Sequence, residues 1–179
     1  MRGVFMKGNS IYLAPLEVSC IENYMKWFND TEVTRYLAMY YPVNSFCERK
    51  YIENSSRASD QVAFDLFLNE SDRHIGNCAL TQIDWVNRRC VFGSAIGEKD
   101  CWGKGYGTEA TILCVEYAFN RLNLHRVGLE VYTYNDRAAK VYKKAGFTEE
   151  GRLRDSKFMD GRYHDTILMS KLNPLSTEK

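Results

Sequence analysis

The hydrophobic and polar positions along this chain follow two different periods, one typical of strands and one typical of helices. In residues 62–68, 74–84 and 88–96 hydrophobic residues alternate with polar ones, which predicts β-strands. Only Trp85-Val86-Asn87 separates the second strand from the third, so these two are expected to form an antiparallel hairpin. The clearest helical pattern follows at residues 108–122. Its hydrophobic positions on one face are Ala110, Leu113, Cys114, Tyr117 and Ala118.

Further elements are predicted on both sides of this region. Strands are expected at residues 11–15, 125–132, 147–153 and 163–172, and helices at residues 19–28, 45–55 and 135–145. Residues 31–41 are expected to form a short element with a helical turn. Asn44 or Ser45 can cap the second of these helices, and Gly146 is placed to end the third. The last two strands are expected to pair across Asp160-Gly161.

Neither an internal repeat nor a linker interrupts this succession of elements. We therefore expect one α/β (α+β) domain over residues 1–179, with a core at about 11–172 and a loose polar tail at 173–179. A chain of 179 residues is long enough to bury a core of its own.

Composition narrows the class of protein. The chain is 45% hydrophobic and 26% charged, and its formal net charge of +1 does not favour nucleic-acid binding. No apolar run approaches the ~18 residues that a membrane helix needs, and the first residues lack the apolar core of a signal peptide. The expectation is a cytoplasmic protein that binds neither membrane nor nucleic acid.

The cysteines and histidines do not have the spacing of metal ligands. The six cysteines are spread singly without a C-x-x-C pair, and His74, His125 and His164 are dispersed, so no metal site is expected. Cys101 lies next to the glycine-rich segment described below. Its thiol could be reactive there, although a buried, inert thiol is the principal expectation.

The segment Trp102-Gly103-Lys104-Gly105-Tyr106-Gly107-Thr108 connects a predicted strand to a predicted helix. Glycine lets a backbone approach a ligand closely, and a helix start offers unpaired N–H groups and the positive end of the helix dipole. Together they predict a phosphate-binding loop. The dinucleotide pattern G-x-G-x-x-G fails because Thr108 holds the third glycine position, and the P-loop pattern fails because Gly105 follows Lys104. A glycine loop without a ligand is the alternative.

This segment resembles the pyrophosphate loop of the GCN5-related N-acetyltransferase (GNAT) family, (R/Q)-x-x-G-x-(G/A). Both glycines match, whereas Trp102 stands at the Arg or Gln position. Downstream, residues 135–147 are similar at every anchor to the family segment N-x-x-A-x-x-x-Y-x-x-x-G-F. The resemblance covers about residues 11–172. It implies the GNAT fold, in which a mixed, mostly antiparallel central sheet with splayed parallel strands is flanked by helices.

The resemblance also implies acetyl-coenzyme A (acetyl-CoA) as the acetyl donor. Its pyrophosphate would bind the segment from Trp102 to Thr108. Its pantetheine arm would pair with the backbone of Ala95 and Ile96, at the end of a strand that splays from its neighbour. Asn135 would either hold the cofactor arm or cap its helix.

Acetyl transfer requires removal of a proton from the attacking amine and is helped by protonation of the departing thiolate. The resemblance implies Tyr142 as the acid, and a core aromatic residue is the alternative. Glu130 is the candidate base, because it lies between the hydrophobic residues Leu129 and Val131 and faces opposite to them on a strand. A solvated or salt-bridged carboxylate, or a water relay in place of a side-chain base, are the alternatives for Glu130.

The acceptor is expected to lie near residues 25–41 and 156–163. Its candidate ligands are Trp27, Asn29, Asp30, Tyr36 and Tyr40, which offer aromatic surface and polar groups. The branch resembled is that of ribosomal-protein and polyamine acetyltransferases, with similarity to sugar-nucleotide enzymes. An amino-sugar nucleotide or another small amine is the first expectation, and a protein N-terminus or a polyamine is the alternative. A CoA-binding regulatory module is the non-enzymatic alternative, and a homodimer is left open.

Overall fold

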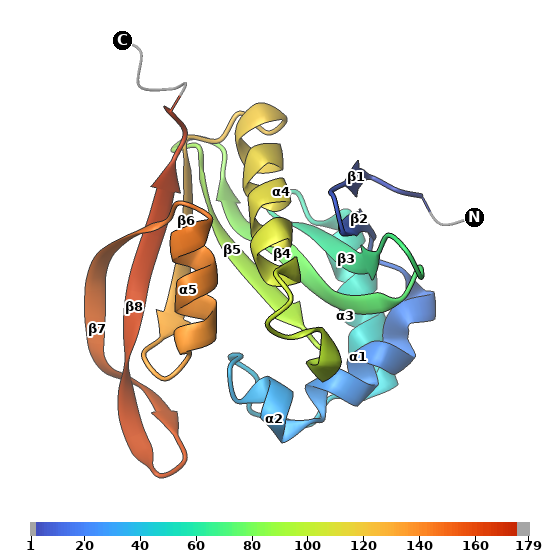
Figure 1. Cartoon of the computed structure of the whole chain (residues 1–179), viewed down its shortest axis with the longest axis horizontal. Coiled ribbons are helices and arrows are strands. Elements are labelled where there is room, and N and C mark those ends of the chain that lie inside the picture. The colour runs from blue at the N-terminus through green and yellow to red at the C-terminus, as the bar shows by residue number, and fades with distance from the viewer. Residues whose placement is uncertain (1–2, 175–179) are drawn as a thin grey trace.

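The computed structural model describes residues 3–174, which form one eight-stranded sheet covered by helices on both faces (Figure 1). The spatial order of the strands is β1-β2-β3-β4-β5-β6-β8-β7, and every neighbouring pair is antiparallel except β5 and β6. The strands are β1 (Met6–Lys7), β2 (Ile11–Pro15), β3 (Val62–Leu68), β4 (His74–Asp84), β5 (Arg89–Ile96), β6 (Arg126–Tyr132), β7 (Thr148–Met159) and β8 (Arg162–Leu172). This mixed sheet confirms the predicted fold class.

Two layers of helices enclose the sheet. The helices are α1 (Ile21–Phe28), α2 (Thr31–Thr34), α3 (Ser45–Arg57), α4 (Tyr106–Asn120) and α5 (Asp136–Lys144). Helices α4 and α5 lie on the face that Figure 1 turns to the viewer, over the larger hydrophobic core. Helix α1 packs on the opposite face, where Tyr24 and Trp27 join Tyr12 and Phe67 in a second core.

The parallel pair β5–β6 separates along its length. It is paired only where Arg89–Val91 meet Arg126–Gly128. Beyond that point β5 stays with β4 as far as Ile96, while β6 stays with β8 as far as Tyr132. The two strands therefore leave a gap between them in the middle of the sheet. The splay implied by the family resemblance is present in the structure.

Most predicted elements lie within a few residues of their expected bounds, and the differences have local causes. Helix α4 begins at Tyr106 rather than Thr108, because Gly105 adopts a φ of 92° directly before it. Strand β7 runs to Met159, well beyond the predicted end at residue 153, since two register shifts against β8 disrupt its alternation. The turn that joins them has positive φ at both Asp160 and Gly161, as a two-residue hairpin turn requires.

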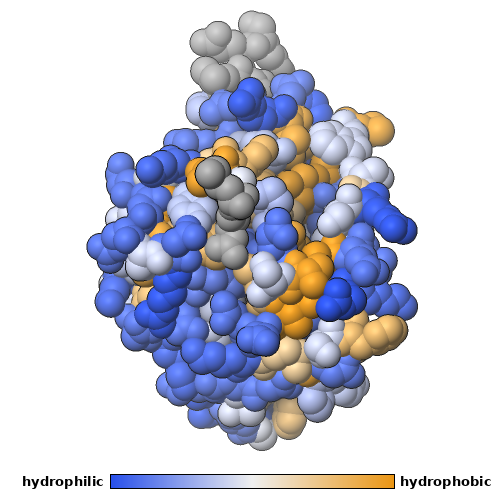
Figure 2. Space-filling view, turned by 90° about the vertical axis from the view of Figure 1, so that its right-hand side faces the viewer, coloured by the Kyte–Doolittle hydropathy of each residue, from blue (hydrophilic) through white to orange (hydrophobic). Residues whose placement is uncertain are grey.

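One face of the molecule is largely polar (Figure 2). On the face shown in Figure 2, hydrophobic residues gather in limited patches among hydrophilic ones. Within residues 3–174, none of the helices is both long enough and apolar enough to pass through a lipid bilayer.

Candidate active site

A pocket of about 910 Å³ lies where β5 and β6 separate. Its wall is built from α2 and the segment after it, β5, the end of β6, the glycine-rich loop with the start of α4, and α5, together with Gln82 of β4. Two helix N-termini, those of α4 and α5, line this one pocket. Their positive dipole ends favour an anionic ligand there.

The glycine-rich loop is shaped as an open cradle in front of α4. Gly103 and Gly105 have φ values of 77° and 92°, and a Cβ built on either would meet no atom within 4 Å. No side chain caps α4, whereas the side chains of Asp30, Asn44 and Asn135 cap α2, α3 and α5. The first N–H groups of α4 therefore face the pocket without a side-chain partner. Such N–H groups can donate hydrogen bonds to the oxygens of a phosphate group.

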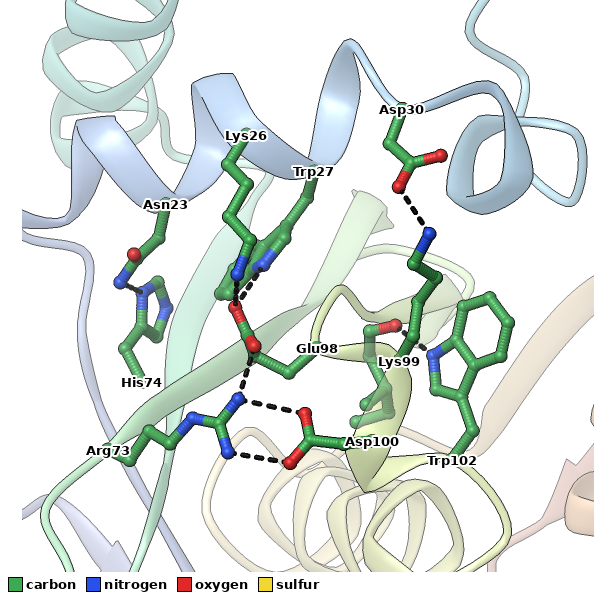
Figure 3. A network of polar contacts seen from close by, with 11 residues as sticks. Asn23, Lys26, Trp27, Asp30, Arg73, His74, Glu98, Lys99, Asp100 and Trp102 are labelled. Atoms are coloured by element: carbon green, nitrogen blue, oxygen red, sulfur yellow. Dashed lines mark hydrogen bonds and ion pairs between the residues drawn. The ribbon is translucent and has the colours of Figure 1, made fainter.

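A polar network holds the segment before this loop against α1 and the β3–β4 turn (Figure 3). Buried Glu98 accepts hydrogen bonds from Lys26 Nζ at 2.7 Å and from Trp27 Nε1 at 2.8 Å, and it forms an ion pair with Arg73. Arg73 in turn holds Asp100 through two hydrogen bonds of 2.7 and 2.8 Å. The loop is thus positioned by side chains remote from it in sequence, which the sequence analysis did not find.

The edge of β5 that faces the gap belongs to Ile96 rather than to Ala95. The carbonyl oxygen of Ala95 lies 2.1 Å from the position of a Cβ on Gly76, so it points towards β4. Backbone direction alternates along a strand, and the carbonyl of Ile96 accordingly points into the gap, where it accepts a hydrogen bond from Trp102 Nε1 at 2.6 Å. Both residues line the pocket, and their backbone pairing with the pantetheine arm stays a prediction.

Tyr142 of α5 lines the pocket, on the sheet face covered by α4 and α5. Its side chain packs edge-on against Phe92 and is 7% exposed. Burial raises the pKa of Tyr142, and a hydrogen bond with Ser94 opposes that change. The hydroxyl is therefore protonated at neutral pH and has a proton to donate. Ser94 was missed by the sequence analysis, because nothing local marks a serine of β5 as a pocket residue.

Glu130 enters the pocket from the other face of the sheet. Its neighbours Leu129 and Val131 are buried in the core beneath α4 and α5, so the Glu130 side chain points the opposite way. It is exposed, lines the pocket, and has no hydrogen bond or ion pair with any residue from 3 to 174. Glu130 and Tyr142 thus approach the gap from its two sides. The salt-bridged alternative does not hold for Glu130.

Asn135 caps α5, which was one of its two predicted roles. Its Oδ1 accepts a hydrogen bond from the N–H of Ala138 at 3.1 Å, and the residue is buried in the pocket wall. Contact of its amide group with the cofactor arm stays a prediction. Tyr106, Gly107 and Thr108 also line the pocket, whereas Lys104 is exposed outside it.

Three of the predicted acceptor ligands have structural roles instead. Trp27 is 2% exposed beneath Gly97, where a Cβ would collide with its ring at 2.0 Å, so it offers no surface to a substrate. The Asn29 side chain bonds the backbone of Met25 and Val43, and Asp30 caps α2 and pairs with Lys99 at 2.8 Å. Sequence proximity suggested these residues, but their side chains are committed to holding α1 and α2.

The two remaining aromatic candidates, Tyr36 and Tyr40, differ in their position relative to the pocket. Tyr36 lines the pocket, and its ring is 6.4 Å from that of Trp102. Tyr40 is largely exposed, and its hydroxyl accepts a hydrogen bond from Lys157 Nζ at 2.7 Å. Tyr132 and Leu37, which the sequence analysis did not single out, belong to the same acceptor side.

Cys101 and one buried cluster that contains His74 lie in the interior of the protein. Cys101 is buried, and burial together with Asp100 raises the pKa of its thiol, so the reactive-thiol alternative has no support. Cys20, Asp65 and His74 bring ligand atoms within 4.8 Å of one another, a cluster that the sequence spacing did not reveal. Asp65 already accepts hydrogen bonds from Tyr24 and from the Glu17 N–H, and His74 Nδ1 contacts Asn23.

Comparison with known proteins adds independent information. A family model described as an acetyltransferase (GNAT) domain matches residues 10–148. The spermidine N(1)-acetyltransferase of Escherichia coli (strain K12) is 32% identical over 166 residues, covering 90% of this chain and 85% of that protein. YdaF of Bacillus subtilis (strain 168), which carries the name of a ribosomal N-acetyltransferase, is 36% identical over 97 residues, covering 54% and 52%.

The same fold occurs in solved structures. The spermidine N-acetyltransferase from Vibrio cholerae, in complex with CoA and spermine, superposes with a TM-score of 0.84 at 24% identity. The match covers 92% of this chain and 96% of that chain. At this level of identity the likeness concerns the fold.

Proposed function

This chain belongs to the GNAT acetyltransferase family and is an acetyl-CoA-dependent N-acetyltransferase, and we propose that its acceptor is the N-terminal α-amine of a protein or peptide. The observation that carries the proposal is the charge on the acceptor side of the gap. Glu130 is a pocket-lining carboxylate there without a cationic partner among residues 3–174. One such carboxylate suits an acceptor with one ammonium group near the reacting nitrogen.

Three other carboxylates around the acceptor side are already neutralised, and Asp136, which also lines the pocket, lies in the first turn of α5. Lys99 Nζ lies 2.8 Å from Asp30 and 2.7 Å from Glu32. Asp160, at the tip of the β7–β8 hairpin, pairs with Arg35 at 2.7 Å. A polyamine carries several positive charges and would need several unpaired carboxylates, which these ion pairs remove.

A buried cation adds to this charge pattern. Lys157 of β7 is 2% exposed, and its Nζ donates to the carbonyl of Leu37 at 3.3 Å and to the hydroxyl of Tyr40. The same Nζ lies 4.5 Å from the centroid of the Tyr132 ring, which neighbours the acceptor side of the pocket. A fixed positive charge here disfavours a polycation and tolerates a peptide, whose single charge is at its terminus.

The geometry supports direct transfer between two bound substrates. The neutral amine attacks the thioester carbonyl, so that the new N–C bond forms and the C–S bond breaks. Glu130, directly or through water, accepts the proton that the nitrogen loses, and Tyr142 donates its hydroxyl proton to the departing sulfur. An α-amine has an ordinary pKa of about 7.7–8.0, so it needs less help to become neutral than an alkylamine.

A polyamine acceptor is the second candidate, because a relative named spermidine N(1)-acetyltransferase is 32% identical across most of this chain. The amino-sugar nucleotide expected first has no support among the relatives.

A panel of acceptors tests the proposal. Initial rates of CoA release are measured with acetyl-CoA and a short peptide with a free N-terminus, the same peptide with a blocked N-terminus, spermidine, and an amino-sugar nucleotide. We expect kcat/KM for the free peptide to exceed that for spermidine by at least about tenfold, since about 1.4 kcal/mol of charge repulsion suffices for that ratio. A preference for spermidine would reject the peptide acceptor and support the second candidate.

Replacing Glu130 by Gln is expected to lower kcat/KM for the acceptor roughly tenfold and to leave CoA binding unchanged. We expect a smaller loss of kcat/KM than is usual for removal of a general base. Glu130 is exposed, so water can accept part of the proton transfer in its place. The acidic limb of the pH dependence of kcat/KM should change in shape but persist, because the amine itself must also lose its proton there. Glu116→Gln, an exposed carboxylate on α4, is the control. An unaltered profile in Glu130→Gln would favour a water relay without Glu130.

A further inference from the structure

Arg137, in the first turn of α5, has a guanidinium that is fixed on aromatic rings yet lacks an anionic partner. Its Cζ lies 3.8 Å from the centroid of the Trp102 ring and 5.2 Å from that of Tyr36. No ion pair or hydrogen bond joins its side chain to any other residue between 3 and 174. A stacked guanidinium holds five N–H donors in one plane, so its edge is free to bind a planar or tetrahedral oxyanion.

The platform beneath Arg137 is itself rigid. Trp102 directly precedes Gly103, and its Nε1 is anchored on the Ile96 carbonyl at 2.6 Å. The ring therefore has a defined position at the entrance to the glycine-rich loop, and Arg137 stacked on it lines the same pocket. The guanidinium lies between the starts of α4 and α5, both of which direct N–H groups and positive dipole ends towards the pocket.

The surroundings of Arg137 favour an incoming anion over an internal one. Arg137 is exposed overall, and the Trp102 ring covers one face of its guanidinium. Glu32 is held by Lys99 at 2.7 Å and does not pair with Arg137. A guanidinium that has lost part of its hydration without gaining a carboxylate is stabilised when an oxyanion binds.

We propose that Arg137, held on the Trp102 ring, binds the pyrophosphate of the acetyl donor and supplies the side-chain cation of a site otherwise made of backbone N–H groups. The proposal rests on the acetyl-CoA-dependent function stated above. Helix α5 then has two roles: Arg137 binds the pyrophosphate of the donor, and Tyr142 faces its reacting sulfur. It also assigns to Trp102 the role of a positioning residue.

Isothermal titration of CoA into Arg137→Gln tests this assignment without turnover. We expect the Kd for CoA to rise about tenfold, in the range of one lost charge-assisted hydrogen-bond pair. Acetyl-pantetheine lacks the pyrophosphate, so its kcat/KM as a donor should stay within about twofold of the wild-type value. Lys143→Gln removes the same charge from an exposed position of α5 outside the pocket and is expected to change neither quantity.

A double-mutant cycle tests the role of the ring. Trp102→Leu alone should weaken CoA binding, and combining it with Arg137→Gln should add little, because the two residues act as one unit. Equal loss for CoA and acetyl-pantetheine, fully additive effects, or a Kd for CoA in Arg137→Gln within twofold of wild type would each overturn the proposal. Failure of the wild-type protein to bind CoA would instead overturn the donor on which it rests.

Discussion

The Tyr142→Phe variant is expected to turn over at least about 100-fold more slowly than the wild type, with little change in KM for acetyl-CoA. Loss of a general acid typically costs that much or more. Phe keeps the ring that packs against Phe92 and Phe147 and removes only the hydroxyl, which burial keeps protonated in the native protein. Single-turnover rates with saturating donor and acceptor measure the chemical step directly.

Two controls separate chemistry from packing. The midpoint of thermal unfolding of Tyr142→Phe should stay close to that of the wild type, since the buried ring is retained. Ser94→Ala removes the hydrogen-bond partner of the hydroxyl and should have a much smaller effect on turnover than Tyr142→Phe. A Tyr142→Phe enzyme that works at the parent rate would show that Tyr142 is a packing residue.

Gly105→Val is expected to weaken CoA binding by at least about 100-fold. A β-branched residue is strained at the φ of 92° that Gly105 adopts, and its side chain would project into the open space before the loop. Moving the first N–H groups of α4 by even a small amount removes two or more charge-assisted hydrogen bonds to the pyrophosphate, each worth about 1.5–3 kcal/mol. Calorimetry with CoA measures the change in Kd.

Gly161 provides a matched control for backbone strain. It has a φ of 79° and equally open space, but it lies in the turn between β7 and β8, outside the pocket. Gly161→Val should therefore destabilise the fold to a similar extent while CoA binding stays near the wild-type value. Unchanged affinity in a folded Gly105→Val protein would contradict the assignment of the cradle.

Short continuous motifs beside the pocket were visible in the sequence, whereas a contact between distant residues was not. The glycine-rich loop and the Asn135–Phe147 segment were found from the sequence because each is continuous, so its spacing is visible in the chain. Arg137 lies within the second segment, but its relation to Trp102 was not visible, since 35 positions separate the two residues and the folded chain stacks them at 3.8 Å. The departure at Trp102 from the family pattern is thus accompanied by a cation from α5.

The acceptor side was predicted less well. Trp27, Asn29 and Asp30 are close in sequence to residues that line the pocket, but α1 and α2 turn their side chains into the core, towards Val43 and towards Lys99. Aromatic and polar residue types suit structural and binding roles alike. Only the packing of α1 on Gly97 and Glu98 decides that Trp27 belongs to the core.

By itself the sequence indicated the order and type of most elements, a helix cap at Asn44 or Ser45, the glycine-rich loop before α4 and the family, because these depend on periods and spacings within short segments. Tertiary structure decided which edge of β5 faces the gap, which carboxylates stay unpaired, and which side chains meet across the sheet. Those properties depend on register between strands and on ion pairs such as Asp160–Arg35, formed between residues 125 positions apart. Glu130 and Tyr142 line one pocket only because β5 and β6 separate.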